Sequence, residues 1–157
     1  RVGGLYLPNG NPAPGPKYDY KLDWKGHLKT HAADLMKAEE PIVLCGDYNI
    51  IPRADDCWDE TVWSDDALAL PTSRDAFRRL KNLGLTEAVE SADNRGHQYT
   101  FCDYQGGAFP KYHGIRIDHH LLSPQAADRL EGVEIYRKAR GLEKPSDHVP
   151  VIVTLTD

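Results

Sequence analysis

The chain has 157 residues, a length typical of one domain, with 24 acidic against 19 basic side chains and a formal net charge of −5. Hydrophobic residues make up 40% of the sequence, which is enough for a packed core and excludes wholesale disorder. No apolar run is long enough to predict a membrane-spanning helix, and no signal-peptide pattern opens the chain. Three widely spaced cysteines fit neither a disulfide framework nor a C-x-x-C zinc site, so we expect a cytoplasmic protein.

The predicted elements begin with a short strand over residues 2–7, followed by a turn-rich segment over residues 8–16. Residues 19–38 have the apolar spacing of an amphipathic helix, and a proline after them prevents its continuation. The side chains expected to face the core are Trp24, Leu28, Ala32, Leu35 and Met36. Lys25 and Lys29 fall between these apolar positions, so we expect them on a solvated face.

The middle of the chain alternates between apolar and irregular segments. Residues 42–45 form a short apolar run that is typical of a buried strand. Residues 52–71 are irregular and acidic, and we expect a solvated surface loop with at most one helical turn. Thr72 or Ser73 is expected to cap a further helix that ends near a glycine at residue 84.

The last third of the chain is rich in β-prone residues. Strands are expected over residues 99–104, 115–123, 132–137 and 149–155, with a loop over residues 139–146. Strand candidates therefore outnumber the predicted helices and surround them along the chain. This pattern predicts a mixed α/β (α+β) fold in which helices pack in layers against a β-sheet.

Polar or ionisable residues lie at the ends of several predicted strands, where α/β folds commonly place their sites. They occur in four short segments, residues 6–10, 46–49, 116–118 and 145–148. Taken one at a time, each segment has an ordinary interpretation, because an Asp after a strand is commonly a turn or cap residue. Together they supply three Asp, one Asn, one His and one Tyr, which form a coherent set for phosphodiester hydrolysis.

Each of these residue types has a defined use in that reaction. Carboxylates bind a hard divalent cation that retains water, and a further carboxylate can orient or deprotonate an attacking water. A neutral amide and a cationic imidazole can stabilise the charge on a pentavalent phosphate. An Asp bonded to the His would fix its tautomer and raise its affinity for a proton.

In their order along the chain, these motifs resemble the exonuclease III branch of the endonuclease/exonuclease/phosphatase superfamily. Gly-Asp-x-Asn together with Ser-Asp-His is specific to the superfamily, and the resemblance covers nearly the whole chain. The Tyr-x-Pro-x-Gly and Glu-Lys-Pro-Ser-Asp-His forms indicate the exonuclease III branch. The matching segments are residues 5–10, 42–50, 114–118 and 143–151.

The resemblance implies a catalytic role for five residues. Asp47 is implied to orient or deprotonate the attacking water, and Asn49 is implied to contact the phosphate. Tyr6 is similar to a family tyrosine that lies against the scissile phosphate. Asp118 is implied to orient His148, whose imidazole would stabilise the phosphoryl oxygens.

The same resemblance implies a metal site and a DNA surface. The implied ligands of a Mg²⁺ or Mn²⁺ ion are Asp147, Asp47 and Asn49. Phe101 falls where relatives carry an aromatic residue near the pocket for an abasic sugar, and Lys144 is a further DNA-binding candidate. Arg116 is also a DNA-binding candidate, with a structural role as its alternative. The implied substrate is duplex DNA with abasic sites or 3′ ends, with no membrane involved.

Two features of the family are missing from the sequence. They are an early Asn and a metal-binding Glu, which the family carries on strands of its first half. The chain, residues 1–157, therefore resembles a single domain that lacks its N-terminal half, the second half of a four-layer α/β sandwich. Its start at Arg1 also favours a fragment. We expect weaker Mg²⁺ binding and an apolar sheet face that a missing half or a second chain would cover.

The predicted function is a metal-dependent DNA repair nuclease with 3′→5′ exodeoxyribonuclease and abasic-site endonuclease activity. One alternative is a phosphoesterase of the same superfamily that acts on nucleotides or phospholipid headgroups. The aromatic and partly basic residues 99–113 favour DNA over that alternative. The other alternative is a catalytically inactive truncated fragment that acts only as a binding module.

The remaining histidines have simpler interpretations. His27 and His31 have the i, i+4 spacing of a zinc site, but no third ligand is near in sequence, so we expect surface residues. His119 and His120 would face opposite sides of a strand, where local packing is the expected role.

Overall fold

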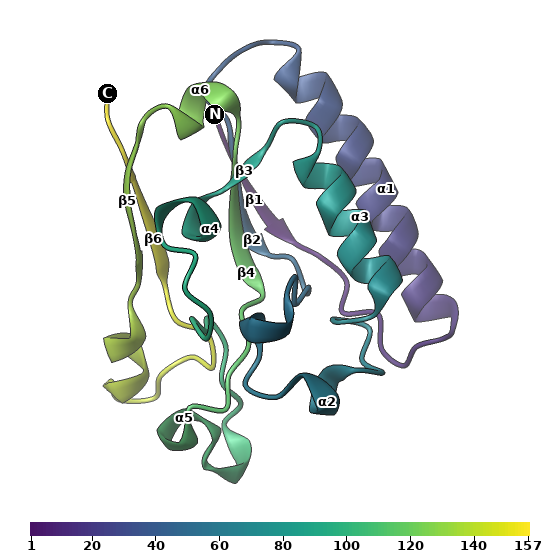
Figure 1. Cartoon of the computed structure of the whole chain (residues 1–157), viewed down its shortest axis with the longest axis vertical. Helices are drawn as coiled ribbons and strands as arrows, with labels where there is room; N and C mark the ends of the chain where they lie inside the picture. Colours follow the sequence, from purple (N-terminus) through teal and green to yellow (C-terminus); the bar gives the residue numbers. More distant parts are fainter.

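A mixed four-stranded sheet stands at the centre of the computed structural model, which describes residues 1–157 (Figure 1). The strands of the chain are β1 (Val2–Tyr6), β2 (Val43–Asp47), β3 (Thr86–Glu87), β4 (Asp118–Leu122), β5 (Leu130–Ile135) and β6 (Val151–Leu155). The central sheet has the order β1-β2-β4-β3, with β1 and β2 parallel and β4 antiparallel to both of its neighbours. Strands β5 and β6 form a separate antiparallel pair.

Two long helices, α1 (Pro16–Met36) and α3 (Pro71–Lys81), pack side by side along one face of the sheet (Figure 1). Both begin with proline at the first helical position, where the missing N–H has no intrahelical partner to lose. The short helices are α2 (Glu60–Trp63), α4 (Ala88–Ala92), α5 (Ala108–Lys111) and α6 (Pro124–Ala127), and the 3₁₀ turns are η1 (Ala54–Asp56), η2 (Gln105–Gly107) and η3 (Arg137–Gly141). The predicted mixed α/β fold, a mixed sheet with flanking helices, is confirmed.

The main core lies between the sheet and the two long helices. Leu28 and Ala32 of α1 are buried there against Phe77 of α3 and against Leu44 and Leu121 of the sheet. The other apolar residues predicted to face inward from the first helix pack at the edge of the same core; they are Trp24, Leu35 and Met36. The predicted apolar face of this helix is therefore confirmed.

The burial of Lys25 contradicts its predicted place on a solvated face of α1, whereas Lys29 is exposed as predicted. Lys25 is only 5% exposed, and Lys21 is fully buried. The long aliphatic stem of a lysine packs like an apolar side chain, so an apolar environment can surround it. Neither Thr72 nor Ser73 caps α3, because the helix begins earlier, at Pro71. The buried hydroxyl of Ser73 donates instead to the carbonyl of Ala67 at 2.6 Å.

Two other segments differ from their predictions. Residues 52–71 are not a solvated loop, because Asp56, Cys57 and the run Ala67–Ala69 are buried. Residues 99–104 do not form a strand; Phe101 makes isolated bridges on either side instead. Tertiary contacts decide both cases, since neither segment has a clear apolar period of its own.

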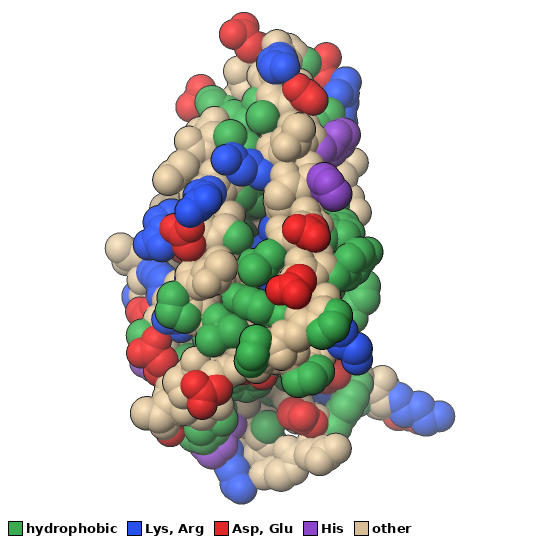
Figure 2. Space-filling model, turned by 90° about the vertical axis from the view of Figure 1, so that its right-hand side faces the viewer, with side chains coloured by type: hydrophobic (Ala, Val, Ile, Leu, Met, Phe, Trp, Pro, Cys, Tyr) green, Lys and Arg blue, Asp and Glu red, His purple; other side chains and the backbone are tan.

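The outer surface of α1 and α3 carries charged side chains and histidines (Figure 2). His27 and His31 are both exposed on α1, as expected for surface residues. No helix of the chain combines the length and the apolar character that crossing a bilayer requires.

Candidate active site

Three adjacent strands bring Tyr6, Asp47 and Asp118 together at one edge of the sheet. Tyr6 ends β1 and is in register with Asp47, which ends β2. Asp47 is in turn paired with Asp118, the first residue of antiparallel β4. Directly paired residues point to the same face, so the three side chains lie side by side, on the face opposite α1 and α3.

Gly46 allows β1 and β2 to approach closely just before the site. Its φ is +145°, a region that residues with a side chain rarely adopt. A Cβ atom added there would overlap the carbonyl oxygen of Leu5 in β1. The glycine of the Gly-Asp motif is therefore required by the backbone that positions Asp47.

The turn after β2 holds the Asp47 carboxylate in place. The backbone N–H of Asn49 donates to Oδ1 of Asp47 at 2.8 Å, and Nδ2 of Asn49 donates to Oδ2 at 3.2 Å. The same Nδ2 donates to the carbonyl of Leu7 at 2.8 Å. Both hydrogens of the Asn49 side-chain amide are therefore already used, and Asn49 orients Asp47. To donate to a phosphate, this amide would have to give up its bond to Leu7 or to Asp47.

The environment of Asp47 favours its use as a base. Burial raises the pKa of Asp47, and the negative charge of Asp118 raises it further, against the opposing effect of the bond from the N–H of Asn49. A carboxylate with a raised pKa accepts a proton more readily from an attacking water.

His148 is bonded to Asp118, with its Nδ1 at 2.9 Å from Oδ2. This hydrogen bond is the main reason that the pKa of His148 is raised, with partial burial opposing it and the charges of Asp118, Asp47 and Asp147 adding to it. The imidazole therefore keeps its proton, and so its positive charge, to higher pH.

Residues 99–102 connect the segment of His148 to β4. Thr100 accepts the N–H of Val149 at its carbonyl, at 2.8 Å, while its hydroxyl oxygen accepts the N–H groups of Ile117 and Asp118 at 3.1 and 3.2 Å. Phe101 packs edge-on against the His148 ring, with ring centroids 5.0 Å apart. Phe101 also lines a hollow with Trp58, Trp63 and His113. The aromatic residue predicted for the sugar pocket thus lies beside the imidazole.

The chain offers few ligands for a metal ion. No group of three or more His, Cys, Asp or Glu side chains is arranged to hold one. Asp147 is half-buried next to His148, and its only polar side-chain partner is the Ser146 hydroxyl at 3.5 Å. So few carboxylates would suit only an ion that retains several waters, such as Mg²⁺, and they exclude an all-protein cage.

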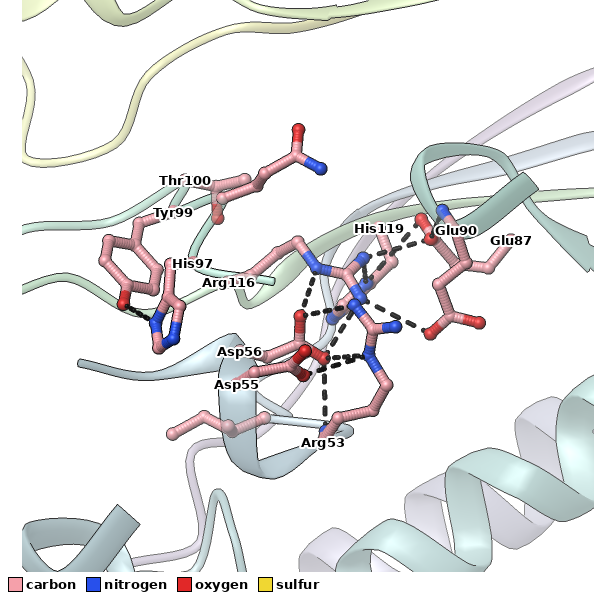
Figure 3. Close-up of polar contacts among 12 residues, drawn as sticks. Arg53, Asp55, Asp56, Glu87, Glu90, His97, Tyr99, Thr100, Arg116 and His119 are labelled. Carbon is pink, nitrogen blue, oxygen red and sulfur yellow. Dashed lines mark hydrogen bonds and ion pairs between the residues drawn. The ribbon is translucent and has the colours of Figure 1, made fainter. Parts of the chain in front are cut away.

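Arg116 does not face a DNA surface, and this prediction is wrong. Its side chain is fully buried, and Figure 3 shows it between acidic groups. Its guanidinium donates to Asp56 at 2.8 and 3.1 Å, to Glu87 at 2.9 Å and to Glu90 at 3.3 Å. His119 lies 3.2 Å from the same group. The network joins η1, β3, α4 and β4, so Arg116 supports the strand that carries Asp118.

Sequence reasoning missed the partners of Arg116 and the buried Lys21. Arg116 lies between two apolar residues, Ile115 and Ile117, in a segment predicted as a strand. This apolar surrounding is the signal that could have indicated a buried cation. Lys144 is exposed in the loop before the Ser146–His148 turn, and its contact with DNA stays a prediction.

The sequence matches the Endonuclease/Exonuclease/phosphatase family over residues 1–148. It is 29% identical to the exodeoxyribonuclease III of Haemophilus influenzae over 154 residues, covering 93% of this chain and 58% of that protein. The structure is similar to the 3′-5′ exonuclease NExo from Neisseria meningitidis, with a TM-score of 0.95, 37% identity and 99% of this chain covered. It is also similar to an AP endonuclease from Archaeoglobus fulgidus, with a TM-score of 0.93, 29% identity and 98% of this chain covered. The chain spans 60% of each of these two structures.

Proposed function

Because the chain belongs to the Endonuclease/Exonuclease/phosphatase family, we propose that the protein is a metal-dependent DNA repair nuclease. The proposed activities are 3′→5′ removal of nucleotides from duplex DNA and incision at abasic sites. The observation that carries the proposal is the Asp118–His148 pair beside the Asp47–Asn49 turn, on one edge of the sheet. The names of the relatives, an exodeoxyribonuclease III and an AP endonuclease, favour DNA over other phosphodiesters.

The residues have distinct parts in the proposed hydrolysis. Asp47 orients a water in line with the phosphorus–O3′ bond and takes its proton as the water oxygen attacks phosphorus. The phosphorus–O3′ bond breaks, and the 3′ oxygen takes up a proton from solvent water and leaves as a hydroxyl. Asp47 returns the proton it has taken to the solvent. His148, kept cationic by Asp118, donates to a non-bridging phosphoryl oxygen on which charge develops. Tyr6 is 78% exposed at the same edge. In the proposed reaction its hydroxyl contacts the phosphate.

We propose that Asp147 holds a Mg²⁺ or Mn²⁺ ion, with Asp47 and Asn49 as further oxygen donors. When bound, such an ion would neutralise charge on the phosphate and on the leaving oxygen. Asp147 suits this part because its carboxylate has no salt-bridge partner in the chain and lies one residue from His148.

The test is cleavage of a duplex oligonucleotide that contains one tetrahydrofuran abasic-site analogue. The reaction is run with Mg²⁺ and with EDTA, using the native chain, Asp47→Asn, and Asp23→Asn as a matched control on the exposed surface of α1. We expect incision that needs the metal, is lost in Asp47→Asn and is retained in Asp23→Asn. A folded native chain that cleaves neither this duplex nor a recessed 3′ end would contradict nuclease activity of this chain.

A further inference from the structure

Lys21 places a fully buried ammonium group beneath the candidate active site. Its Nζ donates to the carbonyls of Asn9 and Asn49, each at 2.8 Å, and to the carbonyl of Ala67 at 2.9 Å. An ammonium has three N–H donors, so each of them has an acceptor. The three carbonyls belong to the loop after β1, the loop after β2 and the segment before α3, which are distant in sequence.

We propose that Lys21 is a positioning residue of this site, whose ammonium group ties the loop after β1 to the loop after β2 and so fixes Asn49 against Asp47. Its effect on catalysis rests on the proposed function, whereas its effect on the geometry of the two loops does not.

The geometry of Asn49 connects the buried lysine to the site. Asn49 has a φ of +46°, in the left-handed region that is uncommon for residues other than glycine. In this conformation its carbonyl points to Lys21, while its N–H and its amide nitrogen point to Asp47. Lys21 therefore stabilises the backbone conformation that turns the Asn49 side chain toward the catalytic carboxylate.

The loop after β1 is held by the same group. The side chain of Asn9 donates to Oδ1 of Asn49 at 3.3 Å, and Lys21 binds the carbonyls of both residues. Gly10 leaves room for the lysine stem, because a Cβ atom at this position would lie 2.5 Å from its Cδ. The loop after β1 therefore packs around Lys21. This packing indicates that Lys21 positions the loop and does not only fill space in the core.

Lys25 provides a matched control for the test. It lies one turn further along α1 and is also buried, but its Nζ has no hydrogen-bond partner in the chain. Lys21→Met and Lys25→Met thus make the same chemical change at two buried positions of one helix. They differ in that Lys21 alone is bonded to the two site loops.

The first measurement uses NMR on the native chain and needs no substrate. We expect the ammonium nitrogen of Lys21 to show through-hydrogen-bond couplings to the carbonyl carbons of Asn9 and Asn49. In Lys21→Met, we expect hydrogen exchange at the N–H of Asn49 to accelerate by about tenfold or more, as in local opening. Exchange at Leu121, in the core of β4, should change much less than exchange at Asn49, which separates positioning from a general loss of stability.

The second measurement uses the abasic-site duplex. We expect Lys21→Met to lower kcat by about tenfold or more with a small change in KM, because a misplaced Asp47 weakens the transition state more than substrate binding. Lys25→Met should retain both values. If the native chain does not cleave DNA, the proposed function fails, and the NMR data alone decide the role of Lys21.

Two results would overturn the inference. One is the absence of couplings from Lys21 to Asn9 and Asn49 in the native chain, a measurement that also decides the case if Lys21→Met does not fold. The other is a folded Lys21→Met whose Asn49 exchange and kcat match those of Lys25→Met.

Discussion

Asp118 and His148 form a 2.9 Å hydrogen bond across a separation of 30 residues. Asp118 opens β4, whereas His148 lies in the loop before β6, so the pair depends on how these two segments meet. Thr100 connects the two segments, because it accepts hydrogen bonds from backbone N–H groups of both. The electrostatic state of the imidazole is thus set by tertiary contacts outside its own motif.

We expect Asp118→Asn to lower the pKa of His148, because the hydrogen bond that the imidazole donates to the carboxylate is the main cause of its raised pKa. The folded pKa lies above the unfolded value, so the pair contributes stability at pH values below about 6.5, and this contribution is lost as the pH rises through the folded pKa. The measurement is an NMR titration of the imidazole, with Asp103→Asn, on an exposed loop residue, as control. An unchanged titration in Asp118→Asn would show that the bond does not set the charge of His148.

Gly46→Ala should unfold or strongly destabilise the β1–β2 pair. The added methyl group overlaps the carbonyl of Leu5, and the φ of +145° is unfavourable for alanine, so we expect a loss of more than about 3 kcal/mol. Gly4→Ala is the matched control in β1, because nothing lies within 4 Å of its added Cβ atom. Urea denaturation compares the two variants, and similar midpoints for both would contradict the close approach of β1 to β2 at Gly46.

Arg116→Met tests whether Arg116 stabilises the fold or contacts DNA. Removing the guanidinium leaves the buried Asp56 and Glu87 without their cation, and we expect a loss of about 3–5 kcal/mol in urea denaturation. Arg79→Met removes an exposed pair with Asp75 and should change stability little. Affinity of the folded fraction for duplex DNA should be unchanged in Arg116→Met; a selective loss of affinity with normal stability would show that Arg116 contacts DNA.

Lys25→Met should stabilise the protein at neutral pH. Burial lowers the pKa of Lys25 to about 6, helped by the charge of Lys21, so the folded chain binds fewer protons than the unfolded chain between about pH 6 and 10.5. Native stability should therefore rise with pH over this window. The variant should remove that dependence and gain up to about 5 kcal/mol at pH 7. Urea midpoints at three pH values measure both effects. A variant that is less stable at every pH would show that the amine has a favourable partner.

Much of the fold follows from local sequence patterns. The apolar spacing of residues 19–38 predicts α1, and its end differs from the prediction by two residues. The start of α1 lies three residues earlier than predicted, because Pro16 at the first helical position is compatible with the helix. Short elements such as β3 and α4 were not predicted, since a few residues carry no periodic signal and are stabilised by their neighbours in space.

Short motifs with turn-forming neighbours at strand ends were enough to single out Asp47, Asn49, Asp118 and His148 as one candidate site. Which charged residues are buried depends instead on how distant segments pack. Arg116 and Lys21 look like surface residues in the sequence, yet each is enclosed by acceptors from segments far along the chain. Charged groups can be buried at moderate cost when such partners surround them, and only the packing of distant segments supplies those partners.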